Sequence, residues 1–295
     1  MMSPPRTLLL AVAALTASVL GHGHVRRVLV NGVEYPGFER YKLGDQSNAV
    51  TWYFTTEDEG PVPMSAINGP DIVCHLGATN AQSAVPVAAG GRLEIVRFNT
   101  RGGFQHPGPE MHYLAPCGDA GCANVDKNNL RFFKIYERGL VQGGMADSPD
   151  WVTQRWATTE IHKNVRTEGE GFVDAYTVNI PANIRPGGYV LRHELLGLHM
   201  AHEGITEFYP QCINIEVSGS GTQLPDGVRA AEMYHSGDPG VAVDIWVNLQ
   251  SYQIPGPALS GVALKREAPR HNIHSHHNRV HSLKRHPRQL KPAAI

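Results

Sequence analysis

Apolar and polar residues alternate along several short segments of the chain. Within residues 212–217, Ile213, Ile215 and Val217 fall on one face of an extended segment, and polar residues fall on the other. A repeat of two residues is typical of β-strands that pack one face against a core. The same pattern predicts further strands at residues 25–30, 92–98, 174–180 and 189–198, the last of which is apolar enough to be buried.

Turn-forming residues separate these segments. Clusters of Gly, Pro and Asn stand at residues 102–109 and 184–188, and the chain holds 31 Gly and 21 Pro. Helical periodicity is brief, with one or two turns expected within residues 127–136. Many short strands joined by turns predict an all-β fold, an immunoglobulin- or fibronectin-like antiparallel β-sandwich with long loops and a few short helical turns.

The first 21 residues have the pattern of a secretory signal peptide. Arg6 supplies a positive charge, residues 8–20 form an apolar run too short to span a membrane, and Val19 and Gly21 are small enough for a cleavage site. Cleavage is expected after Gly21. No later stretch is long and apolar enough for a transmembrane helix, so we expect a secreted, extracellular protein without a membrane partner.

Residues 259–295 differ in composition from the rest of the chain. They contain Lys, Arg, Pro and six of the 16 histidines but little apolar pattern, which predicts a disordered basic tail. Such a tail can bind metal loosely, although a solvated linker remnant is the simpler interpretation. The folded domain is therefore expected at residues 22–258. Residues 22–257 carry a net charge of −9, which is unsuited to a nucleic-acid partner.

Four cysteines, an even number, predict disulfide bonds in a secreted protein. Three pairings are possible. Cys117 and Cys122 are near enough in sequence to close a local loop, which leaves Cys74 to pair with Cys212. A metal site built from cysteines is the alternative, but export to an oxidising compartment favours disulfides.

Cleavage after Gly21 would leave His22 at the amino terminus. A terminal histidine offers a free α-amine and a ring nitrogen, which together can chelate one metal ion. The amine must be neutral to ligate, and its usual pKa of about 7.7–8.0 makes this form accessible at mild pH. Sites with only nitrogen ligands favour copper among divalent first-row metals. Taken alone, a terminal histidine is weak evidence, since histidine serves many other roles.

Further motifs follow His22 in a definite order. They read His-Gly-His-Val at 22–25, His-Pro-Gly-Pro at 106–109, Tyr-Leu-Ala-Pro-Cys at 113–117, Leu-Arg-His-Glu-Leu-Leu at 191–196 with Leu-His at 198–199, Tyr-Pro-Gln-Cys at 209–212, Tyr-His at 234–235 with Asp-Pro-Gly-Val at 238–241, and Tyr-Gln-Ile-Pro-Gly-Pro at 252–257. This series closely resembles the fungal lytic polysaccharide monooxygenases of auxiliary activity family 9, formerly glycoside hydrolase family 61. The resemblance extends over roughly residues 22–258.

The resemblance implies a copper site of the kind called a histidine brace. His22 matches the terminal histidine, which binds one copper ion through its α-amine and ring, and His106 matches the second histidine. Tyr209 matches an axial tyrosine near the copper. Without the resemblance, His106 would be read as a solvated loop residue and Tyr209 as a core aromatic. His24 and His112 are nearby in sequence, but neither stands at the matched position.

Other matches surround this set. His199 matches a histidine that hydrogen-bonds the oxygen-derived ligand, whereas His193 lies in the buried strand and is expected to be structural. Cys212 matches a cysteine that pairs with the counterpart of Cys74. Glu207 departs from the family, which usually has Gln there. An ionised Glu only accepts hydrogen bonds and can take up a proton, so we expect oxygen or peroxide handling to be altered.

The implied substrate is cellulose or a related β-glucan, cleaved with an external electron donor and dioxygen or hydrogen peroxide. Tyr252 matches a surface tyrosine that stacks on sugar rings, and Tyr35 lies in an early loop that can contribute; packed turn tyrosines are the alternative for both. A monomer is expected.

Two other functions compete with this hypothesis. A glycoside hydrolase needs two carboxylates that flank the scissile bond, and no such pair stands out in the matched motifs. A copper- or polysaccharide-binding protein without turnover is the second, and a purely structural sandwich is a more distant third. The complete set of His22, His106, His199 and Tyr209 argues against the binding protein without turnover, while Glu207 keeps that alternative open.

Overall fold

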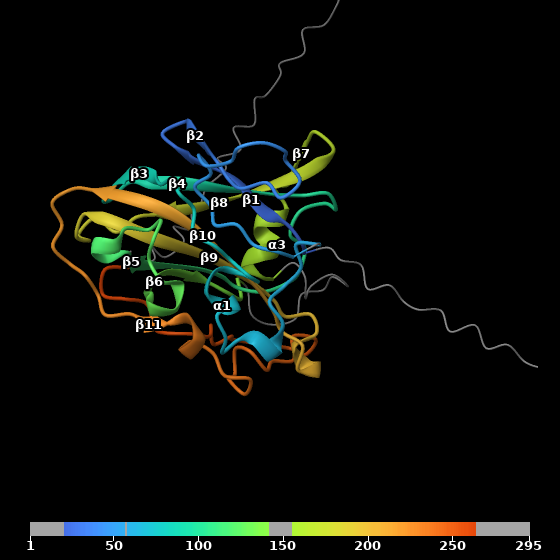
Figure 1. The fold of residues 1–295 in the computed structure, drawn as a ribbon. Helices are drawn as coiled ribbons and strands as arrows, with labels where there is room; N and C mark the ends of the chain where they lie inside the picture. The colour runs from blue at the N-terminus through green and yellow to red at the C-terminus, as the bar shows by residue number, and fades with distance from the viewer. Residues whose placement is uncertain (1–20, 57, 142–154, 264–295) are drawn as a thin grey trace, which may run out of the picture. The chain divides into compact units, whose positions relative to one another are not determined.

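A computed structural model of the chain describes residues 21–56, 58–141 and 155–263 (Figure 1). Apart from Gly21, the expected signal peptide lies outside these residues, and so does the tail from residue 264 onward. The chain divides into a unit that ends at Leu264 and a second unit, Lys265–Ile295, which is outside the described part. The fold below is that of the first unit.

The first sheet has five strands in the order β2-β1-β4-β8-β7. Every pairing within it is antiparallel. Asn31 and Gly32 join the first two strands with φ values of 51° and 79°, the left-handed conformation that a tight two-residue hairpin requires. The strands are β1 (His24–Val30), β2 (Val33–Pro36), β4 (Arg92–Asn99), β7 (Arg166–Glu168) and β8 (Gly171–Asn179).

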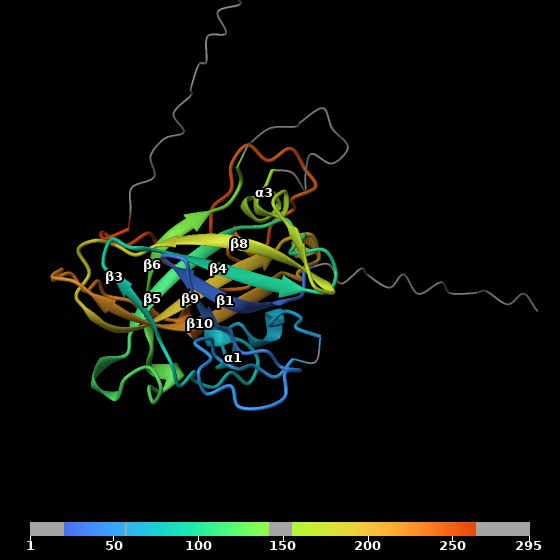
Figure 2. The same ribbon diagram turned by 90° about the horizontal axis from the view of Figure 1, so that it is seen from above.

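The second sheet has six strands in the order β11-β6-β5-β9-β10-β3. Its pairings are antiparallel except that β3 runs parallel to β10. The strands are β3 (Val85–Ala88), β5 (Glu110–Pro116), β6 (Arg131–Arg138), β9 (Gly187–Gly197), β10 (Glu207–Ser218) and β11 (Val228–Arg229). The two sheets lie in stacked layers (Figures 1 and 2), which confirms the predicted β-sandwich.

Helical structure in the described residues is confined to short pieces, two α-helical and five 3₁₀. The helical turns expected within residues 127–136 are present only as a 3₁₀ turn, after which β6 begins at Arg131. Phe132 and Phe133 are both buried, on opposite faces of this strand, so the segment lacks the alternation that reveals a strand in sequence. The pieces are α1 (Asp71–Cys74), α3 (Ala157–His162), η1 (Met64–Ala66), η2 (Gly118–Ala120), η3 (Lys127–Asn129), η4 (Ala201–Glu203) and η5 (Ala230–Glu232).

The six-stranded sheet is buried on both faces. One face packs on the five-stranded sheet through an inter-sheet core that includes Ile95, Leu191 and Ile213. The other face is covered by long loops and forms a second core around Trp52 and Phe208. Double burial explains why β9 reads as a nearly continuous apolar run, and it agrees with the burial expected for residues 189–198.

Both predicted disulfides are present. One joins Cys74 to Cys212 and so ties α1 to β10, and the other joins Cys117 to Cys122. The packed chain continues slightly past the expected boundary at residue 258, because Leu259 bridges to Lys134 beside β6. Among the described residues, no helix is long and apolar enough to cross a membrane.

Candidate active site

The turn at residues 106–109 places His106 at one end of the inter-sheet core. The Thr158 hydroxyl, at the start of α3, donates a 2.7 Å hydrogen bond to the His106 carbonyl and accepts one of 3.0 Å from the Gly108 amide. A Cβ at Gly108 would lie 1.9 Å from the Leu196 carbonyl oxygen. The turn can therefore approach β9 closely only because residue 108 is glycine.

The rings of His199 and Phe104 pack against the His106 imidazole. It stacks on His199 with ring centroids 4.1 Å apart, and the edge of Phe104 meets it at 5.7 Å. Phe104 also contacts Tyr209 edge to face at 5.1 Å. Burial, with smaller contributions from His199 and His22, lowers the pKa of His106 to about 3. The ring is therefore neutral near pH 7 and keeps a lone pair for a metal.

Glu207 and Tyr209 lie on the same face of β10, two residues apart. The Tyr209 hydroxyl donates a 2.8 Å hydrogen bond to Glu207 Oε2, which stands 3.4 Å from His106 Nε2. The other oxygen, Oε1, is 3.9 Å from His199 Nε2. Burial raises the pKa of Glu207, and the hydrogen bond from Tyr209 opposes this rise. His106, His199 and Glu207 thus present ligand atoms that converge within 4.8 Å.

His199 follows β9 and is anchored through its backbone. The indole N–H of Trp246 donates a 2.9 Å hydrogen bond to the His199 carbonyl. Burial lowers the pKa of His199, and its Nδ1 is buried without a hydrogen-bond partner among the described residues. A neutral imidazole with an uncommitted nitrogen can donate or accept a proton at the site.

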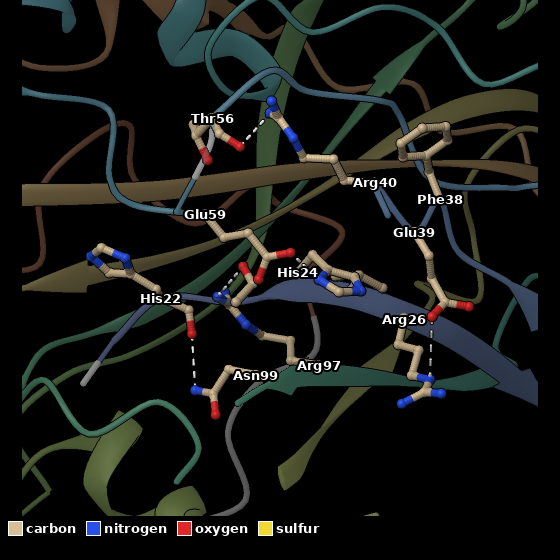
Figure 3. Close-up of polar contacts among 12 residues, drawn as sticks. His22, His24, Arg26, Phe38, Glu39, Arg40, Thr56, Glu59, Arg97 and Asn99 are labelled. Carbon is tan, nitrogen blue, oxygen red and sulfur yellow. Dashed lines mark hydrogen bonds and ion pairs between the residues drawn. The ribbon is translucent and has the colours of Figure 1, made fainter. Parts of the chain in front are cut away.

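His22 adjoins the site: its ring centroid lies 6.4 Å from that of Tyr209, and its backbone faces Asn99 (Figure 3). Its Nδ1 donates a 2.7 Å hydrogen bond to the Asp58 carbonyl, and its own carbonyl accepts one of 2.9 Å from Asn99. Gly21, still joined to His22, packs on His106: a Cβ on Gly21 would lie 2.4 Å from His106 Nε2. The His22 nitrogen is therefore beside His106, while the His22 ring is outside the convergent cluster.

The segment after His22 is held by Gln211 and Arg97, for which the sequence predicts no role in the site. Gln211 on β10 donates a 2.9 Å hydrogen bond to the Gly23 carbonyl and accepts one of 2.6 Å from the Val25 amide. Arg97 donates to the same Gly23 carbonyl at 3.1 Å (Figure 3). Gln211 shares a strand face with Glu207 and Tyr209, so its two-residue spacing could have predicted a position at the site. No comparable spacing in the sequence points to Phe104, Thr158 or Trp246.

The two tyrosines expected to bind substrate are both half-buried. Tyr252 packs edge to face on Trp156 at 4.8 Å, and its hydroxyl donates a 2.6 Å hydrogen bond to the Gly240 carbonyl. Tyr35 lies on β2 opposite Val28 and packs against the inter-sheet core. These contacts are those of packed turn and strand residues, and a role in substrate binding stays a prediction for each.

The donors at this end of the core suit copper. The neutral His106 imidazole stands beside the backbone of residues 21 and 22, and the His22 nitrogen would become an amine if Gly21 were removed. Gly21 packs tightly against His106. A free amine at His22 would therefore lie near the His106 ring nitrogen. Such a nitrogen-rich set favours copper among divalent metals.

Comparison with known proteins gives a consistent result. Residues 22–253 match the model of Auxiliary Activity family 9 (formerly GH61). The chain is 41% identical over 255 residues to AA9 family lytic polysaccharide monooxygenase D of Podospora anserina, covering 85% of this chain and 69% of the relative. It is 38% identical over 256 residues to monooxygenase cel61A of Hypocrea jecorina, covering 85% and 69%. The solved extended catalytic domain of H. jecorina LPMO9A superimposes with a TM-score of 0.73 at 36% identity, covering 84% of this chain and 94% of that structure.

Proposed function

The chain belongs to auxiliary activity family 9, formerly glycoside hydrolase family 61, and from this premise we propose that its copper site is built on His22 and His106. The family consists of copper-dependent lytic polysaccharide monooxygenases, so the chain is an enzyme that cleaves polysaccharide by oxidation. The observation that carries the proposed site is the packing of Gly21 against the His106 ring.

Removal of residues 1–21 would convert the His22 backbone amide into an α-amine beside His106. The His22 ring would then have to leave the Asp58 carbonyl, to which its Nδ1 is now bonded, and turn toward the same metal. His22 would supply two nitrogens, His106 a third, and Tyr209 a hydroxyl oxygen close to the bound metal. A bound copper ion would supply one-electron redox chemistry and activation of dioxygen or hydrogen peroxide, with electrons from an external donor.

The surrounding side chains position the site and handle protons. Phe104 is buried and contacts the rings of both His106 and Tyr209, so it holds these two rings in place from the core side. Glu207 fixes the Tyr209 hydroxyl and offers a carboxylate within reach of both histidine rings. His199 and Glu207 are therefore the groups we assign to proton transfer during turnover.

We assign cellulose or a related β-glucan as substrate and the extracellular space as the place of action. Stacking on flat sugar rings needs exposed aromatic faces beside the site. Trp246 is 51% exposed and bonded to the backbone of His199, so it joins Tyr252 and Tyr35 as a residue for this role. The enzyme is proposed to act as a monomer.

The presence or absence of Gly21 before His22 gives the sharpest test of the proposed copper site. Two proteins would be compared, one that begins at His22 and one that retains Gly21, both given copper, ascorbate and amorphous cellulose in air. Mass spectrometry should find oligosaccharides with oxidised ends from the first and none from the second. Omitting copper or ascorbate is the matched control.

Other outcomes would contradict parts of the proposal. Equal activity of the two proteins would exclude the α-amine as a ligand. Unoxidised fragments would indicate a hydrolase. Tight copper binding without products on cellulose, xylan, xyloglucan or mixed-linkage glucan would indicate a binding protein.

A further inference from the structure

A second cluster of metal-binding side chains lies inside the β-sandwich. Glu110 and His112 are on β5, and His193 is opposite His112 on β9. All three point into the inter-sheet core and are 3% exposed or less. None of them belongs to the site at His22 and His106, and their position does not depend on the proposed function of that site.

The three side chains converge on one point. His112 Nε2 lies 3.1 Å from His193 Nδ1 and 3.2 Å from Glu110 Oε1. All three atoms are within 4.8 Å of one another. In a tetrahedral zinc site with bonds of about 2.0–2.1 Å, neighbouring ligand atoms stand about 3.3 Å apart. The two short distances therefore match the edges of a metal coordination shell.

Hydrogen bonds alone leave this cluster poorly satisfied. A single proton on His112 Nε2 faces two acceptors, His193 Nδ1 and Glu110 Oε1, and can align well with one of them. Among the described residues, His112 is the only ion-pair partner of Glu110, although a buried carboxylate needs a compensating charge.

We propose that Glu110, His112 and His193 bind one divalent transition-metal cation of the zinc class. Two imidazoles and a carboxylate form a nitrogen- and oxygen-donor set that zinc accepts, and the cation would compensate the buried Glu110 carboxylate. Ligation through His112 Nε2 and His193 Nδ1 sets the tautomers, with protons on the opposite ring nitrogens, which are buried and unpartnered among the described residues. A site this enclosed takes up its ion during folding and has a structural role.

The test is the metal content of the secreted, copper-loaded enzyme that begins at His22. Inductively coupled plasma mass spectrometry should find a second metal, near one equivalent, that remains after chelation of the native protein. Glu110→Gln keeps the shape of the side chain, and His112→Phe keeps a ring to stack on Tyr136, 5.1 Å away. Both variants should lose the second equivalent. His235→Gln, at a histidine side chain that is 79% exposed, is the matched control and should keep it.

Electron paramagnetic resonance of the copper at His22 tests the proposed copper site separately. The copper signal should be the same in wild type and variants, because the second metal is bound elsewhere. X-ray absorption at the zinc edge of the wild type should show nitrogen and oxygen ligands at about 2.0–2.2 Å with imidazole scattering. The wild-type measurements decide the question even if a variant does not fold. A wild-type protein with no metal beyond the terminal copper, or a second metal retained in both variants, would overturn the proposal.

Discussion

Gly197 on β9 lies directly opposite Glu207 on β10, and a Cβ at Gly197 would stand 2.8 Å from Glu207 Oε2. The same Cβ would lie 3.2 Å from the Cβ of His106. The missing side chain at residue 197 thus leaves the space in which a carboxylate can reach both His106 and Tyr209.

Gly197→Ala is expected to move the Glu207 carboxylate away from Tyr209 and to disturb His106. Small displacements at a reacting centre are costly, so cellulose oxidation should fall by about tenfold to a hundredfold while thermal stability changes little. Initial rates of oxidised product and a melting curve would measure the two effects. Gly237→Ala, where an added Cβ meets nothing within 4 Å and the backbone φ is not positive, provides the comparison. A variant with full activity would show that the position of Glu207 is unimportant.

In Glu207→Gln, an amide takes the place of the carboxylate. The carboxylate can take up and release a proton, and the amide cannot. Because burial raises the pKa of Glu207, the wild-type rate should change with pH above the usual range for a glutamate, as the carboxyl loses its proton. The variant should lack this inflection and use hydrogen peroxide at a different rate. Rates of product formation across acidic to neutral pH would show this, with Glu203→Gln, at an exposed acid nearby, as control. Identical reduction, peroxide use and pH dependence would exclude a special role for Glu207.

The two disulfides should differ in their contribution to stability. Cys74 and Cys212 are 138 residues apart, whereas Cys117 and Cys122 are five apart. Loop-closure entropy then predicts a loss of about 5 kcal/mol for the double alanine variant of the first and about 2 kcal/mol for that of the second. Denaturant unfolding of the two variants would measure both losses. Equal losses would mean that the unfolded chain retains structure that shortens the effective loop.

Arg192 and Glu194 form a fully buried ion pair on the loop-covered face of β9. Burial disfavours the charge of Arg192, but attraction to Glu194 outweighs it and raises the arginine pKa. Glu194 also accepts a hydrogen bond from Tyr234, and Arg192 donates 2.8 Å bonds to the Ile72 and Val73 carbonyls.

Arg192→Met should therefore lower the free energy of unfolding by about 3–5 kcal/mol, since it leaves Glu194 buried and unpaired. Adding Glu194→Gln should recover part of that loss, and unfolding curves of the single and double variants would give the coupling. Strictly additive losses would show that the two charges do not interact. Arg229→Met, at an exposed arginine, should change stability by well under about 1 kcal/mol.

Much of the sandwich was predictable from local pattern. Strands such as β4 and β8 alternate in their buried positions because one face meets the inter-sheet core and the other faces outward. Strands buried on both faces lose this signal, and β6 illustrates the consequence: residues 131–136 belong to a strand although a brief helical repeat is visible there. The parallel pairing of β3 with β10 also has no local mark, because it joins segments that are far apart in the chain.

The candidate site divides in the same way. Disulfide pairing, the terminal histidine and the ordered motifs depend on residue identity and spacing, so the chain carries them in readable form. The contacts that make a site of these residues depend on distant segments brought together by packing. They are Gly21 against His106, Phe104 against both His106 and Tyr209, Gln211 holding Gly23, and Glu110 facing His112 and His193. Burial then sets the protonation of these groups, because the cost of removing a charge from water appears only when the core closes around them.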